Sequence, residues 1–146
     1  MGNLQLTSSA FSHGEEIPRE CGYKNGNEVP PLAINGIPEG TKSLTLIMDD
    51  PDAMGAVGKV WVHWVVWNID PTATENLHDA TEGMTDFGEV GYGGPAPPDK
   101  RHTYVFKLYA LDCKLDLPNE STKVDVEKAM EGHIIEQATL TGTYAP

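Results

Sequence analysis

Several features that define other protein classes are scarce in this sequence. Its 146 residues include only two cysteines, Cys21 and Cys113, which stand far apart and form no C-x-x-C pair. A disulfide framework or a zinc-type cysteine cluster is therefore not expected, and free thiols in a reducing compartment are favoured. No apolar run approaches the length of a membrane span, and the first residues, M-G-N-L-Q-L, lack the basic and apolar regions of a secretion signal. We expect a soluble, cytoplasmic protein.

Positive charge is also scarce. The chain has 10 Lys and Arg residues against 22 Asp and Glu residues, so its formal net charge is −12. A field of this sign repels phosphate backbones and anionic lipid headgroups, so we expect neither a nucleic-acid partner nor stable insertion into a membrane. A local pocket can still hold a small anion, because short-range contacts outweigh a screened global charge.

Motifs for nucleotide cofactors and for serine catalysis are missing. The glycine-rich segment G-Y-G-G-P-A-P-P at 91–98 is not followed by G-K-[ST], and it leads into a strand instead of a helix. No G-x-S-x-G elbow is present, which argues against a serine nucleophile of that type. We therefore expect no cofactor. The length fits a single domain, 1–146, large enough to form a hydrophobic core.

The pattern of the chain predicts a mostly β protein. Its 15 glycines and 11 prolines are spread along the sequence, as in many short strands joined by turns. Strands are predicted at 43–48, 60–69 and 103–111; the second is apolar on both faces and should lie centrally in a sheet covered on both sides. Strict alternation places His63 on the face of Val65 and Trp67. A helix is predicted to begin near Thr122, which forms a capping pattern with Asp125, and 134–138 is expected to add a short helical turn before a last strand at 140–144.

Four polar residues lie near the ends of these strands. Asp50 and Asp52 flank Pro51 directly after the first strand, His63 lies inside the second, and His102 opens the third. A buried histidine needs a partner, so His63 is either a core residue bonded to a backbone carbonyl or part of a site. The two aspartates are either turn residues that cap backbone amides or carboxylates aimed by Pro51 at a histidine. A carboxylate beside a histidine favours its charged form, which suits phosphate or carboxylate oxygens.

A metal site built from these four residues is disfavoured, because the sequence has no H-x-x-x-H or H-x-H spacing. No metal is therefore expected. The other histidines, His13, His78 and His133, stand in polar or turn-like contexts and are predicted to be solvated or structural.

The motifs resemble the phosphatidylethanolamine-binding protein family, also called the Raf kinase inhibitor-like proteins. Nearly the whole chain takes part in the resemblance, and its compact length is similar to the bacterial and archaeal branch. The resemblance implies a β-sandwich with a large central sheet, Greek-key-like, with a short helical segment near the C-terminus. The segments that carry it are D-P-D-A at 50–53, V-H-W-V-V-W-N-I at 62–69, G-P-A-P-P and H-T-Y within 94–104, P-P-L at 30–32, T-K-S-L-T-L-I at 41–47, K-L-Y-A-L-D at 107–112 and A-M-E-G-H-I-I at 129–135.

The resemblance also implies a shallow anion-binding pocket that accepts a phosphate, a phosphoryl headgroup or a carboxylate. Its walls in this sequence would be Asp50, Ala53, Trp61, His63, Gly94, Pro95, His102 and Tyr104, with Pro51 and Asp52 supporting the loop. Two positions depart from the family pattern. Met54 replaces a proline, which predicts a more mobile loop. Thr103 replaces an arginine, which removes a positive charge from the site, and the sequence leaves open whether Arg101 supplies that charge instead.

Three functions follow from these observations. The first is a small-anion binding protein, not an enzyme, which inhibits partner proteins such as a kinase or a serine protease, as the resemblance implies. The alternative is a small hydrolase or isomerase that uses His63 or His102 with Asp50 for general acid–base catalysis. The third is an interaction protein whose pocket is vestigial. The sequence leaves open whether the protein forms a homodimer, since an apolar sheet edge or exposed aromatic residues would support one.

Overall fold

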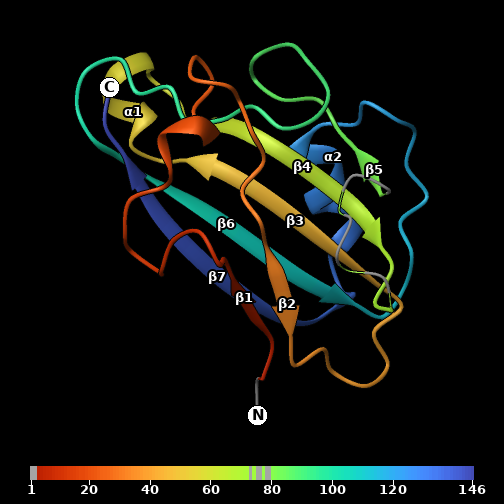
Figure 1. Cartoon of the computed structure of the whole chain (residues 1–146). Coiled ribbons are helices and arrows are strands. Elements are labelled where there is room, and N and C mark those ends of the chain that lie inside the picture. The colour runs from red at the N-terminus through yellow and green to blue at the C-terminus, as the bar shows by residue number, and fades with distance from the viewer. Residues whose placement is uncertain (1–2, 73, 75–76, 78–79) are drawn as a thin grey trace.

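Two antiparallel sheets form the body of the molecule (Figure 1). The computed structural model describes residues 3–72, 74, 77 and 80–146. Met1, Gly2 and His78, on which part of the sequence argument rested, lie outside the described residues. The small sheet pairs β1 (Gln5–Thr7) with β2 (Ala33–Asn35). The large sheet has the order β5 (Thr81–Glu82), β4 (Trp61–Ile69), β3 (Ser43–Asp50), β6 (His102–Leu111) and β7 (Ile134–Tyr144).

The large sheet has a Greek-key order. β3, β4 and β5 follow one another as neighbours, and a long connection then returns the chain to place β6 beside β3 on its other side. This is the Greek-key arrangement, in which the fourth strand returns to lie beside the first of three consecutive strands. Short helical segments accompany the strands: a 3₁₀ turn (Arg19–Cys21), α1 (Ala53–Val57) between β3 and β4, and α2 (Lys123–Met130) between β6 and β7.

Both faces of the large sheet are covered. In Figure 1 the β1–β2 pair and the N-terminal segment lie in front of the sheet, and α2 lies behind it. The front layer closes the larger core, which includes Leu46, Trp64 and Phe106, all inaccessible to solvent. The back layer closes a smaller core, in which Val126 of α2 packs with Trp67. This arrangement confirms the predicted mostly β fold with a large sheet and a short helix near the C-terminus.

The strand bounds differ from the prediction by one residue at the starts of β4 and β6, and by more in two places. β3 continues past residue 48 to Asp50, where its last residues pair with Val62 and Trp61 of β4. The predicted helical turn at 134–138 is wrong, because these residues form the first half of β7 and pair with β6. Gly132 has a φ of +80°, which ends the helical path after α2. The free edge of β6 then satisfies the backbone of 134–138, which a single helical turn would leave unpaired.

No helix among the described residues has the length and apolar character needed to cross a bilayer.

The start of α2 follows the sequence prediction closely. Thr122 is the N-cap: its hydroxyl accepts a hydrogen bond from the Asp125 amide at 3.3 Å, and the Asp125 carboxylate accepts one from the Thr122 amide at 3.0 Å. This reciprocal pair satisfies two amides that a helix start leaves without intrahelical partners. The Lys123 ammonium group then binds the buried Asp49 carboxylate at 2.9 Å and joins the first turn of α2 to β3.

We expect Thr122→Ala to lower the free energy of unfolding by about 1 kcal/mol, because the first turn of α2 loses its cap. Urea denaturation followed by tryptophan fluorescence measures the change. Val124→Ala is the matched control, since Val124 is exposed on the same helix and its replacement should change stability by less than about 0.5 kcal/mol. Equal midpoints for the wild type and Thr122→Ala would contradict the role of the cap.

Candidate anion-binding site

A small cavity lies at the end of the large sheet where β3 runs into α1. Its volume is about 140 Å³. Five of the eight residues that the family resemblance predicted for the pocket walls take part in the lining. The cavity is lined by Asp50, Ala53, Ala56, Val57, Trp61, His63, Phe87, Ala96, Pro98 and His102.

A β-bulge in β4 aims His63 into this cavity. Met48 of β3 pairs with Trp64 of β4, and the next residue of β3, Asp49, pairs with Val62. His63 is skipped and is the extra, unpaired residue of β4. A bulge of this kind rotates a side chain away from the face that strict alternation assigns to it.

The face predicted for His63 is therefore wrong. Val65 packs in the core under α2, whereas the His63 ring lies edge-on to Tyr104, which belongs to the core between the two sheets, with 5.2 Å between ring centroids. Phe87 contacts the imidazole in the same edge-on manner, also at 5.2 Å. The bulge thus turns a strand residue toward the cavity without breaking the sheet on either side.

His63 is held as a neutral ring. Its Nδ1 lies 2.7 Å from the carbonyl oxygen of Gly93, and a carbonyl only accepts, so Nδ1 carries the proton and donates. Burial lowers the pKa of His63, and this effect exceeds the opposing effects of the Gly93 carbonyl and the nearby Asp50 charge. In the neutral ring, Nε2 then carries a lone pair.

His102 has the opposite electrostatic environment. Its Nδ1 lies 2.6 Å from Oδ2 of Asp50, and its Nε2 lies 2.7 Å from Oδ1 of Asp99. Both acceptors are carboxylates, so a ring that donates from both nitrogens is an imidazolium. Burial by itself would lower the pKa of His102, but the hydrogen bonds and charges of the two carboxylates outweigh it and raise the pKa. Desolvation would raise the pKa of Asp99, but its hydrogen bonds to His102 and to backbone amides together lower it.

Asp50 and Asp52 position the loop between β3 and α1. Oδ1 of the buried Asp50 accepts a hydrogen bond from the Asp52 amide at 3.0 Å, while Oδ2 binds His102. Oδ2 of Asp52 accepts a hydrogen bond from the Thr103 amide of β6 at 2.8 Å. Asp50 thus has both of the roles that the sequence left open, since it caps a turn amide and orients a histidine. Asp52 lies outside the cavity lining and contacts backbone.

The other predicted wall residues lie beside the cavity and outside its lining. A Cβ atom on Gly94 would collide with the Cys21 carbonyl oxygen, so this close backbone contact requires glycine. The Pro95 carbonyl accepts a hydrogen bond from the Tyr23 amide at 2.9 Å. Tyr104 lies behind the two histidines, where burial and then the Asp50 charge raise its pKa. Its hydroxyl is buried and has no hydrogen-bond partner within the described part of the chain.

Sequence reasoning missed half of the lining. Ala56 and Val57 come from α1, Phe87 from the loop after β5, and Ala96 and Pro98 from the proline-rich loop before β6. Asp99 was also missed, although its place three residues before His102 was a usable signal. Phe87 had no such signal, because only the fold brings its loop against β4.

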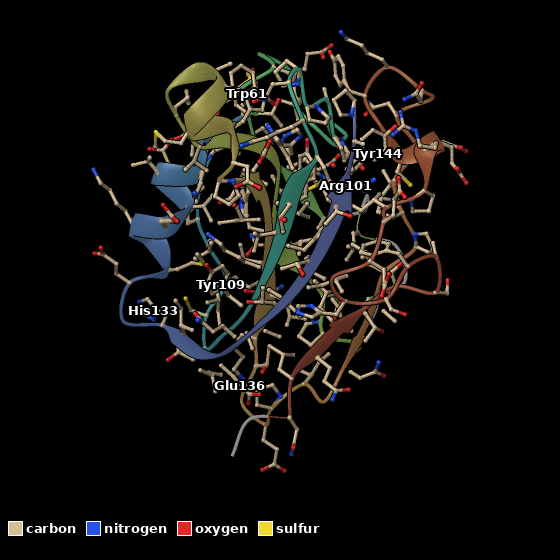
Figure 2. The ribbon with its side chains drawn as sticks, turned by 90° about the vertical axis from the view of Figure 1, so that its left-hand side faces the viewer. Trp61, Arg101, Tyr109, His133, Glu136 and Tyr144 are labelled. Atoms are coloured by element: carbon tan, nitrogen blue, oxygen red, sulfur yellow. The ribbon has the colours of Figure 1, made fainter. Side chains whose placement is uncertain are left out.

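The two departures from the family pattern have simple structural outcomes. Arg101 does not reach the cavity, since its Nη1 binds the Thr143 hydroxyl at 3.1 Å and lies 3.7 Å from the Glu16 carboxylate (Figure 2). Met54 lies in the first turn of α1, and its amide donates to the Pro51 carbonyl at 3.3 Å, a hydrogen bond that proline could not make. The site therefore has no arginine among its lining residues.

Asp99→Asn should lower the pKa of His102, because one of the two carboxylates that stabilise its charged form becomes neutral. NMR titration of the imidazole nitrogens measures the pKa of His102 directly.

The raised folded-state pKa of His102 contributes stability below the pKa of an unfolded histidine, and this contribution is lost as the pH rises through the folded-state pKa. The stability difference between the wild type and Asp99→Asn should therefore shrink as the pH rises above about 6.5. The exposed Asp116→Asn variant is the control, and an unchanged His102 titration in Asp99→Asn would contradict the assignment.

Comparison with known proteins places this geometry in a family. The family model described as phosphatidylethanolamine-binding protein matches residues 7–145. A protein of Methanothermobacter thermautotrophicus named UPF0098 protein is 44% identical, over 97% of this chain and 98% of its own length. The crystal structure of a phosphatidylethanolamine-binding protein homologue from Chlamydia trachomatis superposes with a TM-score of 0.89 at 40% identity, covering 99% of this chain and 98% of the other. A carboxypeptidase Y inhibitor, solved in complex with its cognate proteinase, has the same fold with a TM-score of 0.65 at 19% identity, covering 97% and 83% of the two chains. The chain belongs to the phosphatidylethanolamine-binding protein family.

Proposed function

We propose that this protein binds a small anion in the cavity between Asp50, His63 and His102, and that it regulates partner proteins by inhibition. The ligand would be a phosphate, a phosphoryl headgroup or a carboxylate. The observation that carries the proposal is the pair of histidines in one small cavity, with pKa values shifted in opposite directions. Opposite shifts within one cavity are typical of sites that handle charge or protons.

The size of the cavity limits the ligand. Drug-sized ligands occupy pockets of about 300–1,000 Å³, well above the 140 Å³ found here. A water molecule takes up about 30 Å³ in the liquid, so the cavity has room for roughly five water-sized groups. A single phosphate, acetate or phosphoryl headgroup fits that space, while any longer substituent would extend past Trp61 and Val57 toward solvent.

Binding of an anion would be coupled to protonation of His63. In the free protein, burial keeps this ring neutral, so Nε2 accepts instead of donating. A negative charge in the cavity would favour the imidazolium form, which then donates to the anion. The buried carboxylate of Asp50 opposes the anion, but His102 lies 2.6 Å from that carboxylate and offsets its charge. Binding should therefore take up a proton.

An acid–base enzyme is the weaker interpretation of the same residues. A general base needs a free lone pair within reach of the substrate, and a pKa near the working pH. Both nitrogens of His102 are hydrogen-bonded to carboxylates, and these carboxylates raise its pKa, which favours the charged ring. Asp50 orients His102 and not His63, so within the described part of the chain no carboxylate is hydrogen-bonded to His63 to raise its basicity. These features favour a binding protein over a hydrolase or isomerase.

Titration with phosphate, phosphoethanolamine or acetate should shift the imidazole resonances of His63 and His102, and should leave those of the distant His13 in place. Sulfate, whose charge is constant near neutral pH, tests the coupling to protonation. Its affinity should rise as the pH falls from about 8 to about 5.5, by up to about tenfold per unit where one proton is taken up.

The His63→Asn variant should lose this pH dependence, because it lacks the titrating ring, and His13→Asn should keep it. Unmoved His63 and His102 resonances at millimolar anion would rule out the binding proposal. An esterase or phosphatase activity that His102→Ala abolishes would instead favour the enzyme.

The surface around the cavity supports the second half of the proposal. Met54 and Val57 on α1 are 54% and 53% exposed, and Val57 also lines the cavity. Exposed apolar side chains grouped at a pocket mouth are typical of protein-binding surfaces. The fold is shared with a carboxypeptidase Y inhibitor that binds its proteinase. A serine protease is therefore the first partner class to test, and a protein kinase is the second.

Assays with panels of serine proteases and protein kinases should find an enzyme that this protein inhibits. Replacing both apolar residues in Met54→Asp/Val57→Asp should weaken that inhibition by about tenfold or more, since the pair would carry at least about 1.4 kcal/mol of the binding free energy. Val124→Asp is the matched control, because Val124 is similarly exposed but lies on α2. Equal loss of inhibition in both variants would place the contact surface elsewhere, and inhibition of no enzyme in either panel would overturn the regulatory proposal.

A further inference from the structure

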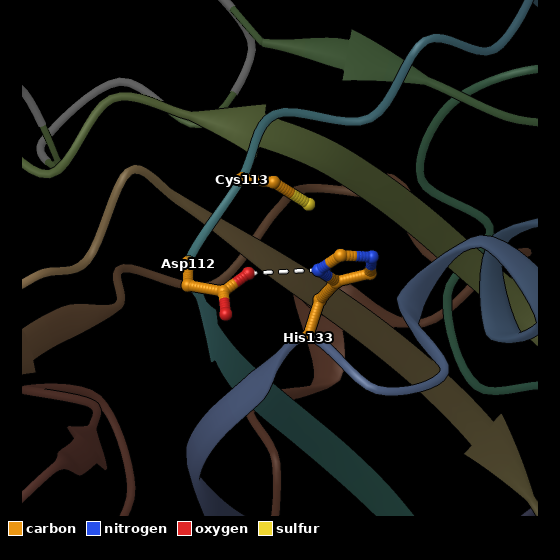
Figure 3. A group of neighbouring side chains, drawn as sticks. All are labelled: Asp112, Cys113 and His133. Carbon is orange, nitrogen blue, oxygen red and sulfur yellow. Dashed lines mark hydrogen bonds and ion pairs between the residues drawn. The ribbon is translucent and has the colours of Figure 1, made fainter.

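Three potential metal ligands meet at the end of the large sheet that is remote from the anion cavity. Asp112 and Cys113 directly follow β6, and His133 directly precedes β7 (Figure 3). Their ligand atoms all lie within 4.8 Å of one another. Figure 3 shows Asp112 and His133 pointing toward each other from two neighbouring segments of backbone, with the Cys113 thiol near the His133 ring.

This cluster is independent of the anion site. Ser43 and Asp50 are the two ends of β3, and Ser43 binds the Cys113 carbonyl while Asp50 lines the anion cavity. Eight residues of extended strand span about 23 Å, so the two places are well separated. In Figure 2, Trp61 is labelled near the top of the molecule and His133 well below it.

The backbone around the cluster is held by several hydrogen bonds. The Asp112 amide donates to the His133 carbonyl at 3.0 Å, and the His133 amide donates to the Met130 carbonyl at 2.9 Å. The Ser43 hydroxyl donates to the Cys113 carbonyl at 2.6 Å. The two segments that carry the ligands are therefore fixed relative to each other, and a cation would need to order little more than three side chains.

The spacing of the donor atoms suits a tetrahedral cation. Bond lengths of about 2.0–2.3 Å to nitrogen, oxygen and sulfur place the donors of one zinc ion about 3.3–3.6 Å apart. In the structure, Nδ1 of His133 and Oδ1 of Asp112 are 2.8 Å apart, and the thiol sulfur of Cys113 lies within 4.8 Å of both ligand groups. The spacing that zinc requires falls between 2.8 Å and 4.8 Å, so side-chain movements of about 1 Å would bring the three donor atoms to zinc-binding distances.

We propose that Asp112, Cys113 and His133 bind a divalent transition-metal ion of the zinc class. A thiolate, an imidazole and a carboxylate together favour zinc and similar ions over magnesium or calcium, which prefer oxygen ligands alone. The side chains of His133 and Asp112 are 46% and 53% exposed, so water can occupy the fourth position. The net charge of −12 raises the local concentration of cations.

Two simpler interpretations explain less. A surface ion pair of His133 with Asp112 would contribute little stability and would not account for the thiol that lies within 4.8 Å of both groups. A nucleophilic cysteine activated by histidine would need a lowered pKa, whereas burial and then the Asp112 charge raise the pKa of Cys113.

A bound ion would join the end of β6 to the start of β7. Residues 114–132, which include α2, would become a closed loop. Because the unfolded chain does not present this set of ligands together, binding would stabilise the folded state in proportion to the free metal concentration. A metal ion at this site would therefore act as a cross-link that stabilises the packing of α2 on the back of the sheet.

The test uses the reduced, metal-free full-length protein titrated with Co²⁺ near neutral pH. We expect one ion per chain, a near-ultraviolet thiolate-to-cobalt charge-transfer band, displacement by Zn²⁺ and no competition from Mg²⁺. Zn²⁺ should raise the melting temperature by several degrees at about 100 times its dissociation constant. Cys113→Ser should abolish the band, and His133→Ala and Asp112→Asn should each weaken binding by about tenfold or more.

The chain provides matched controls. Cys21→Ala removes the other thiol and His13→Ala removes an exposed histidine elsewhere, so both should keep the band and the affinity. Circular dichroism verifies that each variant is folded, and Asp112→Asn still tests the proposal if Cys113→Ser does not fold. Absence of a charge-transfer band, or a band that persists in folded Cys113→Ser, would overturn the proposal.

Discussion

The hydrogen-bonded contact between Asp50 and His102 organises the end of this molecule that holds the small cavity. It joins the last residue of β3 to the first residue of β6 at 2.6 Å, in a place where both side chains are almost fully buried. Two opposite charges out of water require each other, since removal of either leaves the other buried without compensation. The remaining carboxylate oxygen of Asp50 then holds the Asp52 amide, so the same contact fixes the loop that leads into α1. The shape of the cavity depends on this arrangement.

The sheet separates two kinds of chemistry. At one end, a bulge in β4 turns His63 toward His102, and apolar walls from α1 and the proline-rich loop keep the cavity small. At the other end, the close of β6 and the opening of β7 bring a carboxylate, a thiol and an imidazole together. The strands between them carry buried apolar residues from both cores, so each end can be altered without disturbing the other.

Much of the fold could be predicted from local pattern. The strands around Leu46, Val65 and Phe106 follow from runs of apolar and β-branched residues, and the start of α2 follows from the reciprocal pairing of Thr122 with Asp125. The segment 134–138 could not be assigned, because its side chains are exposed or half-exposed and its strand character comes from the edge of β6. The face of His63 was also beyond prediction, since a bulge depends on the register between two strands and alternation within one strand carries no information on it.

The sequence by itself determined the chemical types available to this protein and their order along the chain. Its motifs indicated the family, the residues Asp50, His63 and His102, and the stiff proline-rich loop before β6. Only the tertiary structure decided which of these residues meet. It placed the Asp99 carboxylate at the second nitrogen of His102 and Phe87 against His63, and it bonded the Arg101 side chain to Thr143 of β7 instead of placing it in the cavity. The physical reason is that charge compensation and ring contacts act over a few ångströms in space, and the residues that satisfy them lie on segments that only folding brings together.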